Sequence, residues 1–202
     1  MKKILALIAA ISLVTLTACG QANSAATLGD VTITQTDFQK TVATLVKERE
    51  GVDTSQMQLE NGAALNRSQL RFMIITTIFD ELAKELKLEI SKTEMTTNRQ
   101  DLVSQSGGEE QLANNLVGAQ IASTNFERYI RAIIISDKLT TALKSSGIAE
   151  ADISGKISEL VTAKAKQLKI EINPRYGIWD NETGDVLAKD SAGDAIKSTP
   201  AN

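Results

Sequence analysis

The chain has 202 residues, with 22 Lys and Arg against 25 Asp and Glu, and it contains no histidine. The lack of histidine excludes Ser-His-Asp and Cys-His catalysis in their usual forms, as well as zinc sites that use histidine. The mildly acidic balance does not suit nucleic-acid phosphates, so we predict no nucleic-acid partner. With a single cysteine, no disulfide can form within the chain, and the fold must depend on its apolar core.

The first residues have the pattern of an export signal. Two lysines precede an almost unbroken apolar run from Ile4 to Val14, which is too short for a membrane-spanning helix of about 20 apolar residues. It suits a signal-peptide core. The next residues, Leu16-Thr17-Ala18-Cys19, resemble the lipobox of bacterial lipoproteins, which implies cleavage after Ala18 and a lipid on Cys19. The alternative is an ordinary secretory signal cut near Ala18 or Ala22.

These patterns divide the chain into four parts. We predict a signal peptide over residues 1–18, a tether over 19–25, a folded domain over 26–188 and a tail over 189–202. The tail is polar and rich in small residues, which predicts disorder. If the lipobox prediction holds, the protein is anchored by lipid to a bacterial membrane and faces the extracytoplasmic side.

The folded domain opens with a predicted hairpin over residues 26–34, with Gly29-Asp30 in the turn. Amphipathic periodicity then predicts about six helices. Ser91 and Glu94 have the spacing of a capping box, and Gly107-Gly108 stops the helix that this box begins. The expected helices run from Thr34 or Thr36 to Gly51, from about Leu65 to Leu86, from Ser91 to about Ser104, from Glu109 to near Gly118, from Ser123 to Gly147 and from Glu150 to Leu168.

The pattern changes to strand after Lys169. Ile170-Glu171-Ile172 alternates as a strand, Asn173-Pro174 bends the chain, and Val186-Leu187 forms a return strand. We therefore predict a mainly helical fold, closed by a small antiparallel sheet that joins the N-terminal and C-terminal strands. Pro174, Tyr176 and Trp179 are predicted structural anchors of the last strands. For Trp179, a ligand platform is the alternative.

The middle of the second predicted helix is apolar on more than one face. Its residues would form the core of a helical domain, or part of them would line an open groove for unfolded segments. Under the second interpretation, the candidate client-binding residues are Phe72, Met73, Ile75 and Phe79.

The sequence gives little support for a catalytic or phosphate-binding site. Asp80-Glu81 and Glu109-Glu110 are adjacent carboxylates, and neighbours on a helix point about 100° apart, so neither pair converges on one substrate atom. Gly107-Gly108 lacks the pattern of a phosphate-binding loop. We predict no catalytic residue, no metal, no cofactor and no small-molecule substrate.

Four segments, taken in order, resemble the N-terminal chaperone domain of the SurA/PrsA family of exported parvulin-type foldases. They are LGDVTITQTDF, IFDELAKELKLEISKTEM, SGGEEQLANNLVGAQIASTNFERYIRAIIISDKL and INPRYGIWD, which together span about residues 26 to 180. The resemblance implies a helical domain that binds unfolded or newly exported protein clients without ATP.

The chain departs from that family in two ways. The usual Asn-Gly turn is Gly29-Asp30 here, a change that these turns tolerate. The family foldases also carry a parvulin isomerase domain, for which this chain has no room, and whose active site typically uses histidine. We therefore predict a membrane-anchored chaperone-like lipoprotein without prolyl isomerase activity. The alternative is a scaffold lipoprotein that docks one specific folded partner.

Overall fold

The computed structural model of the chain describes residues 23–189. The predictions for the signal peptide, for lipid attachment at Cys19 and for most of the tail therefore lie outside the described residues. Within them, no helix is both long and apolar enough to cross a membrane.

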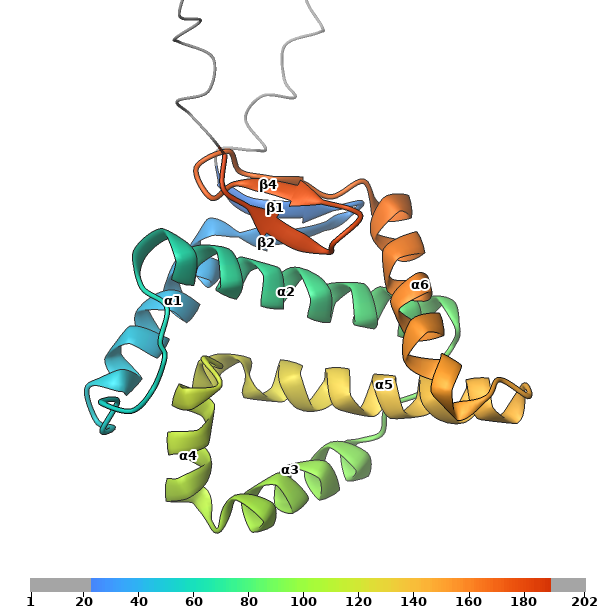
Figure 1. Ribbon diagram of the computed structural model, residues 1–202, viewed down its shortest axis with the longest axis horizontal. Helices are drawn as coiled ribbons and strands as arrows, with labels where there is room; N and C mark the ends of the chain where they lie inside the picture. The colour runs from blue at the N-terminus through green and yellow to red at the C-terminus, as the bar shows by residue number, and fades with distance from the viewer. Residues whose placement is uncertain (1–22, 190–202) are drawn as a thin grey trace, which may run out of the picture.

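The described residues form six α-helices, one 3-10 turn and five short strands (Figure 1). The mainly helical fold predicted from the sequence is confirmed. In chain order the elements are β1 (Ser24–Leu28), β2 (Val31–Thr34), α1 (Gln35–Arg49), α2 (Gly62–Glu85), α3 (Lys92–Ser106), α4 (Glu109–Gly118), the 3-10 turn η1 (Ser123–Asn125), α5 (Phe126–Ser145), α6 (Glu150–Leu168), β3 (Glu171–Ile172), β4 (Ile178–Asp180) and β5 (Asp185–Leu187).

Local capping sets several helix ends. The Thr34 side chain accepts a hydrogen bond from the Asp37 N–H and begins α1. Ser91 and Glu94 form the predicted capping box at the start of α3, which satisfies two backbone donors that the first turn leaves open. Gly107 follows the last residue of α3 in the left-handed conformation, with a φ of 88°, which glycine adopts without a steric penalty.

The strands form two small antiparallel sheets. One has the order β2-β1-β3, and the other pairs β4 with β5. In the first sheet, Ala26 lies opposite Ile172 and Thr27 lies opposite Glu171, so the predicted pairing of the two ends of the domain is confirmed. Trp179 belongs instead to the separate hairpin, where it lies opposite Val186.

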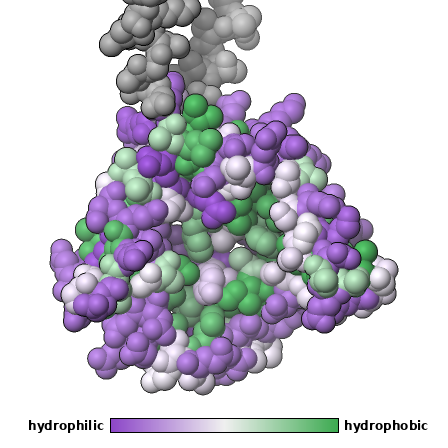
Figure 2. Space-filling view, viewed as in Figure 1, coloured by the Kyte–Doolittle hydropathy of each residue, from purple (hydrophilic) through white to green (hydrophobic). Residues whose placement is uncertain are grey.

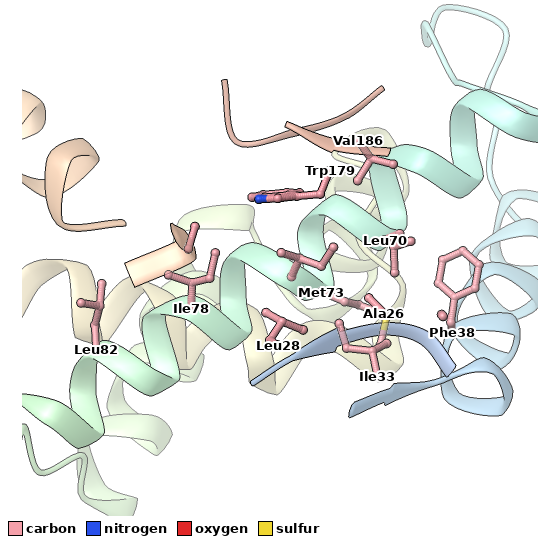
Figure 3. Close-up of a cluster of buried hydrophobic side chains, with 13 residues drawn as sticks. Ala26, Leu28, Ile33, Phe38, Leu70, Met73, Ile78, Leu82, Trp179 and Val186 are labelled. Atoms are coloured by element: carbon pink, nitrogen blue, oxygen red, sulfur yellow. The ribbon is translucent and has the colours of Figure 1, made fainter. Parts of the chain in front are cut away.

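The main core surrounds α2, which crosses the centre of the molecule between the strands and α5 (Figure 1). In Figure 3, Trp179 and Val186 lie on one side of α2, and Leu28 and Ile33 from the first hairpin lie on the other. Leu70, Ile74 and Ile78 of α2 are fully buried in this core. The wide apolar face predicted for this helix follows from these contacts, because α2 is covered from several directions.

A second apolar cluster lies below α2. It contains Leu112 of α4 together with Phe126, Ile130 and Ile134 of α5, and side chains of α3 pack against it. Between the main core and this second cluster, Ala83 of α2 packs against Ile135 and Leu139 of α5. The long helix α5 therefore connects the α3–α4 lobe to the central helix.

Several boundaries differ from the sequence predictions. β1 begins at Ser24, inside the predicted tether over residues 19–25, and α3 extends to Ser106, past the predicted end near Ser104. The first helix ends at Arg49, before Gly51, and α2 begins at Gly62, ahead of the predicted Leu65. Ser123 begins a 3-10 turn, and α5 starts only at Phe126. The helix differences lie within a turn of the predicted ends, where frayed and 3-10 geometries compete with the α-helix.

Candidate functional site

A cleft of about 590 Å³ opens between the first hairpin, α1, α2, α3 and the start of α5. Its volume falls within the range of about 300–1,000 Å³ that is typical of binding pockets. Figure 2 shows apolar residues gathered in the hollow between α2 and α5, with hydrophilic residues around it. The cleft is lined by Val31, Thr32, Ile33, Asp37, Lys40, Thr41, Met73, Thr77, Asp80, Glu81, Lys84, Met95, Thr124, Asn125, Glu127, Arg128 and Arg131.

The α2 side of the cleft has its polar groups satisfied locally. The Thr77 hydroxyl donates to the Met73 carbonyl oxygen at 2.7 Å. It also accepts a hydrogen bond from the Arg128 guanidinium of α5 at 3.2 Å. Because these contacts hold Thr77 against its own helix, Met73 and the threonine methyl group give this surface an apolar component.

Opposite charges alternate along the walls. The Arg131 guanidinium donates to the Asp80 carboxylate at 2.5 Å and so ties α5 to α2. Lys84 makes an ion pair with Glu81 at 2.5 Å on α2 itself. In total the lining has four carboxylates and four cationic side chains: Asp37, Asp80, Glu81 and Glu127 against Lys40, Lys84, Arg128 and Arg131. This balance does not select for a ligand of either charge.

Strand β2 forms one wall of the cleft. Val31, Thr32 and Ile33 all line it, although successive side chains of a strand point to opposite faces. Three consecutive lining residues therefore show that the cleft meets this strand along its edge. That edge is free of any other strand among residues 23–189, because β2 is the outer strand of its sheet.

Asn125 lies at the start of α5 and is 4% exposed. Its side-chain nitrogen has no hydrogen-bond partner among the described residues, and its side chain makes no capping bond to α5. A buried donor without a partner costs about 1–3 kcal/mol. The cleft therefore contains a polar group that the folded domain itself does not satisfy.

The four apolar residues proposed from the sequence as client contacts lie in different places. Met73 is 4% exposed and lines the cleft from the main core. Phe72 and Ile75 are half-buried and pack against the same core. Phe79 is half-buried against the cluster of Ala83 with α5. Phe72, Ile75 and Phe79 have the i, i+3, i+7 spacing of one face of α2. Of the four residues, only Met73 lines the cleft.

The three predicted anchor residues also differ in their surroundings. Trp179 is 8% exposed in the main core, and its indole N–H donates to the Asn181 side chain at 3.1 Å. Tyr176 is half-buried and packs edge-on against Phe38, with ring centroids 4.6 Å apart. Pro174 is exposed in the turn between β3 and β4.

Most of the cleft was not predicted from the sequence. Asp80 and Glu81 were predicted only not to converge on one substrate atom, and the sequence did not indicate that both line a cleft. The basic residues of α5 gave no signal beyond ordinary helix amphipathicity. The strand edge gave none either, because an edge position depends on which strands pair, and that order is a property of the whole fold.

Among residues 23–189, no group of three or more Asp, Glu, Cys or His side chains is placed to hold a metal ion. Met95 of α3 also lines the cleft. The residue before it, Glu94, makes an ion pair with Lys138 of α5. This pairing and the Ser91 donors lower the pKa of Glu94 to about 2. The role of Glu94 is therefore to fix α3 against α5, beside the cleft.

The fold is a mainly helical domain whose cleft is lined by both polar and apolar side chains and is bordered by the outer edge of β2. Residues 1–140 match the SurA-like N-terminal domain, and the chain belongs to this family. The resemblance predicted from the sequence is thereby confirmed, and no parvulin domain is detected. Neither the comparison with curated proteins nor that with solved structures finds a match. Membership of this family suggests chaperone-like binding of client proteins.

Proposed function

We propose that the protein is a membrane-anchored, extracytoplasmic chaperone-like lipoprotein that holds unfolded or newly exported proteins in the cleft between β2 and α5. It binds them without ATP and without catalysis. The observation that carries this proposal is the composition of the cleft within a SurA-like domain: apolar side chains next to equal numbers of acidic and basic ones.

The apolar part of the cleft supports contact with varied segments. Val31 and Met95 are half-buried on opposite sides of it. Methionine adapts its shape to irregular partners, which suits a surface that meets many sequences. Burial of apolar client surface would then supply the attraction, since it requires no defined chemistry in the client.

The charges of the cleft support the same conclusion. Like charges that are brought together disfavour a partner, whereas neighbouring opposite charges can pair with either sign. Asp80 pairs with Arg131 and Glu81 pairs with Lys84. Four other charged side chains line the cleft and lie outside these two ion pairs, namely Asp37, Glu127, Lys40 and Arg128. A client of either charge can thus meet a complementary group. The lining therefore favours broad acceptance over selection of one partner.

Lipid attachment at Cys19 would place this cleft near a membrane. The Gln35 N–H donates to the carbonyl oxygen of Asn23 at 2.8 Å, so the first described residue lies beside the end of β2. Asn23 is the fourth residue after Cys19, and four residues of chain reach at most about 14 Å. The edge of the cleft would then lie close to the surface from which exported chains emerge.

The chaperone proposal is tested by the aggregation of several unrelated denatured proteins. The purified protein should suppress their aggregation at a near-stoichiometric ratio. Thr124→Trp should weaken this effect, because Thr124 is exposed in the cleft and an indole would fill it. Ser123→Trp is the matched control, since the neighbouring Ser123 is equally exposed but does not line the cleft.

A different outcome would identify a scaffold. If no client is held, and one folded protein dominates what is captured from cells, the domain docks a specific partner and the chaperone proposal is wrong. If both tryptophan variants behave like the unmodified protein, clients are held elsewhere than in the cleft.

The anchoring proposal is tested separately. Cys19→Ser should abolish metabolic lipid labelling, because the thioether requires sulfur. The protein should then leave the membrane fraction or accumulate as uncut precursor. Lipid labelling that persists in the variant would overturn the lipobox assignment.

A further inference from the structure

The outer edge of β2 is the feature of the cleft that points to a defined mode of binding. Edge strands present a row of backbone donors and acceptors, which is a template for pairing with another chain. Natural proteins usually protect such edges with proline, inward-pointing charges or a covering element. Residues 31–34 read Val-Thr-Ile-Thr. They contain no proline and no charge and have a strong preference for strand, so the shortness of this four-residue strand and the irregular pairing of β1 near Ser24 are the edge protections that the β1–β2 pair shows.

The register shows which backbone groups face outward. The N–H of Asn173 donates to the carbonyl oxygen of Ala25 at 2.9 Å. The N–H of Gly29, the residue directly after β1, donates to the carbonyl oxygen of Leu168 at 2.7 Å. The odd-numbered residues of β1 therefore direct their backbone groups away from β2. Because backbone direction alternates along a strand, the even-numbered residues of β1 are those that bond to β2.

This alternation determines the position of Thr32. Leu28 lies opposite Val31, and Ala26 lies opposite Ile33, so Val31 and Ile33 bond to β1. Thr32 lies opposite Thr27, between those two pairs. Its N–H and C=O consequently point away from β1, to the edge that faces the cleft, and its side chain is exposed.

We propose that an unfolded client segment binds in extended form, as an additional strand along the outer edge of β2, with the backbone of Thr32 exchanging hydrogen bonds with the client main chain. This inference rests on the proposed function and specifies what the cleft recognises: a polypeptide backbone with free N–H groups. It is a form of strand addition, in which main-chain bonds give affinity and side-chain pockets give preference.

The dimensions of the site fit such a segment. β2 has four residues, which extend over about 13 Å at the usual rise of a strand. Alternate side chains of the added strand would face Met73 and Thr77 on α2, and the others would face solvent. The start of α5 would form the opposite wall, where Thr124 and Arg128 line the cleft.

Recognition through the backbone also explains how one small cleft can accept many sequences. Every client has the same main chain, so its hydrogen bonds need no particular side chain. Extended segments with unsatisfied backbone groups are a property of unfolded proteins and not of folded ones. The mode of binding thus discriminates by conformation.

The first arm of the test changes only the outward N–H. Thr32→Pro removes this donor without removing a bond to β1, and proline is tolerated at such an edge position. Thr32→Val is the matched control, because it keeps the N–H and the branched side chain. With a fluorescent peptide of alternating Val and Ser, binding should weaken about tenfold or more in Thr32→Pro and stay within about twofold in Thr32→Val.

The second arm changes the peptide and needs no variant. A peptide with the same side chains and an N-methyl group on every amide cannot donate along either edge. Against the unmodified protein it should bind about tenfold more weakly than the parent peptide. Methylation removes the client N–H that would donate to the Thr32 carbonyl oxygen, whereas Thr32→Pro removes the Thr32 N–H that would donate to a client carbonyl oxygen. The two changes remove different hydrogen bonds of the same added strand, so each should weaken binding on its own.

The outcomes separate this inference from the proposed function. If aggregation is suppressed and Thr124→Trp weakens that effect, yet neither methylation nor Thr32→Pro changes peptide affinity, clients bind in the cleft without strand addition and the inference is wrong. If the methylated peptide binds as tightly as its parent, the inference is wrong whether or not Thr32→Pro folds. A crosslinker at position 32 that captures only a second copy of this chain would also overturn it, since the edge would then serve a dimer.

Discussion

Trp179 gives the sharpest test of how the domain is held together. It is the only tryptophan in the chain, it is 8% exposed, and it packs in the main core with Val186 and residues of α2. Trp179→Ala removes this contact between the β4–β5 hairpin and the central helix. The indole N–H bond to Asn181 lies within the hairpin, so its loss leaves an acceptor that water can reach.

The magnitude follows from the area that the ring removes from water. A buried aromatic side chain covers about 150–250 Å², which corresponds to about 4–6 kcal/mol at 25 cal/mol per Å². The unfolded chain already buries part of this area, and measured Trp→Ala changes in protein cores cost about 3–5 kcal/mol. The hairpin lies at the surface and can settle onto α2 after the ring is lost. We therefore expect a loss of about 3–4 kcal/mol.

Urea denaturation followed by far-UV circular dichroism measures this loss without using tryptophan fluorescence. With a slope of about 2 kcal/mol per molar urea, the midpoint should fall by roughly 1.5–2 M. Ile178→Ala is the matched control, because Ile178 is the preceding residue and is 52% exposed; its midpoint should change little, as for most surface substitutions. Equal midpoints for Trp179→Ala and Ile178→Ala would refute the assignment of Trp179 to the core.

Three further predictions concern a glycine, an ion pair and catalysis. Gly177→Ala should cost at least about 2 kcal/mol, since Gly177 has a φ of +139° and a Cβ there would meet the Leu187 carbonyl oxygen at 2.2 Å; Gly155→Ala in α6, with open space around it, should raise stability slightly in the same urea titration. The Lys138 ammonium and the Ser91 donors lower the pKa of Glu94 from 4.5 to about 2, so the stability that Glu94 contributes is complete above about pH 4.5 and is lost as the pH falls toward 2; the difference in urea midpoint between the unmodified protein and Glu94→Gln should narrow over that interval. A prolyl isomerisation assay with the purified protein should show no acceleration above the uncatalysed rate. The assay is sensitive, because the uncatalysed step takes tens to hundreds of seconds and even weak turnover would be visible.

The sequence predicted those elements whose signals are local. Glu150–Leu168 was predicted as a helix with the bounds that the structure shows, because its apolar period is continuous and acidic residues occupy its first turn. The capping box at Ser91 was predicted for the same reason, since all its groups lie within four residues. The pairing of the chain ends followed from two strand patterns at the two ends of a helical domain.

Features that depend on distant contacts were predicted less well. Lys164 and Lys166 lie close together near the end of α6, a pattern typical of a solvated helix face, yet the Lys164 ammonium group pairs with Glu85 of α2 at 2.6 Å and its side chain is 9% exposed. No pattern near Lys164 indicates that partner, which lies 79 residues earlier. The same limit applies to the cleft, whose walls come from the first hairpin and from four helices, and whose free edge at Thr32 depends on the strand order.

The family match ends at residue 140, but the hydrophobic core does not. Ala165 of α6, Trp179 of β4 and Val186 of β5 are buried in the same cluster as Leu70 and Ile74 of α2. β3 also pairs with β1, and this pairing places β1 in the middle of its sheet and leaves β2 as the edge that faces the cleft. The segment after the matched region therefore covers the central helix and also determines which strand edge remains open. The stability lost in Trp179→Ala and the binding lost in Thr32→Pro thus test two consequences of one arrangement, in which the last strands close the core and the second strand stays free for a client.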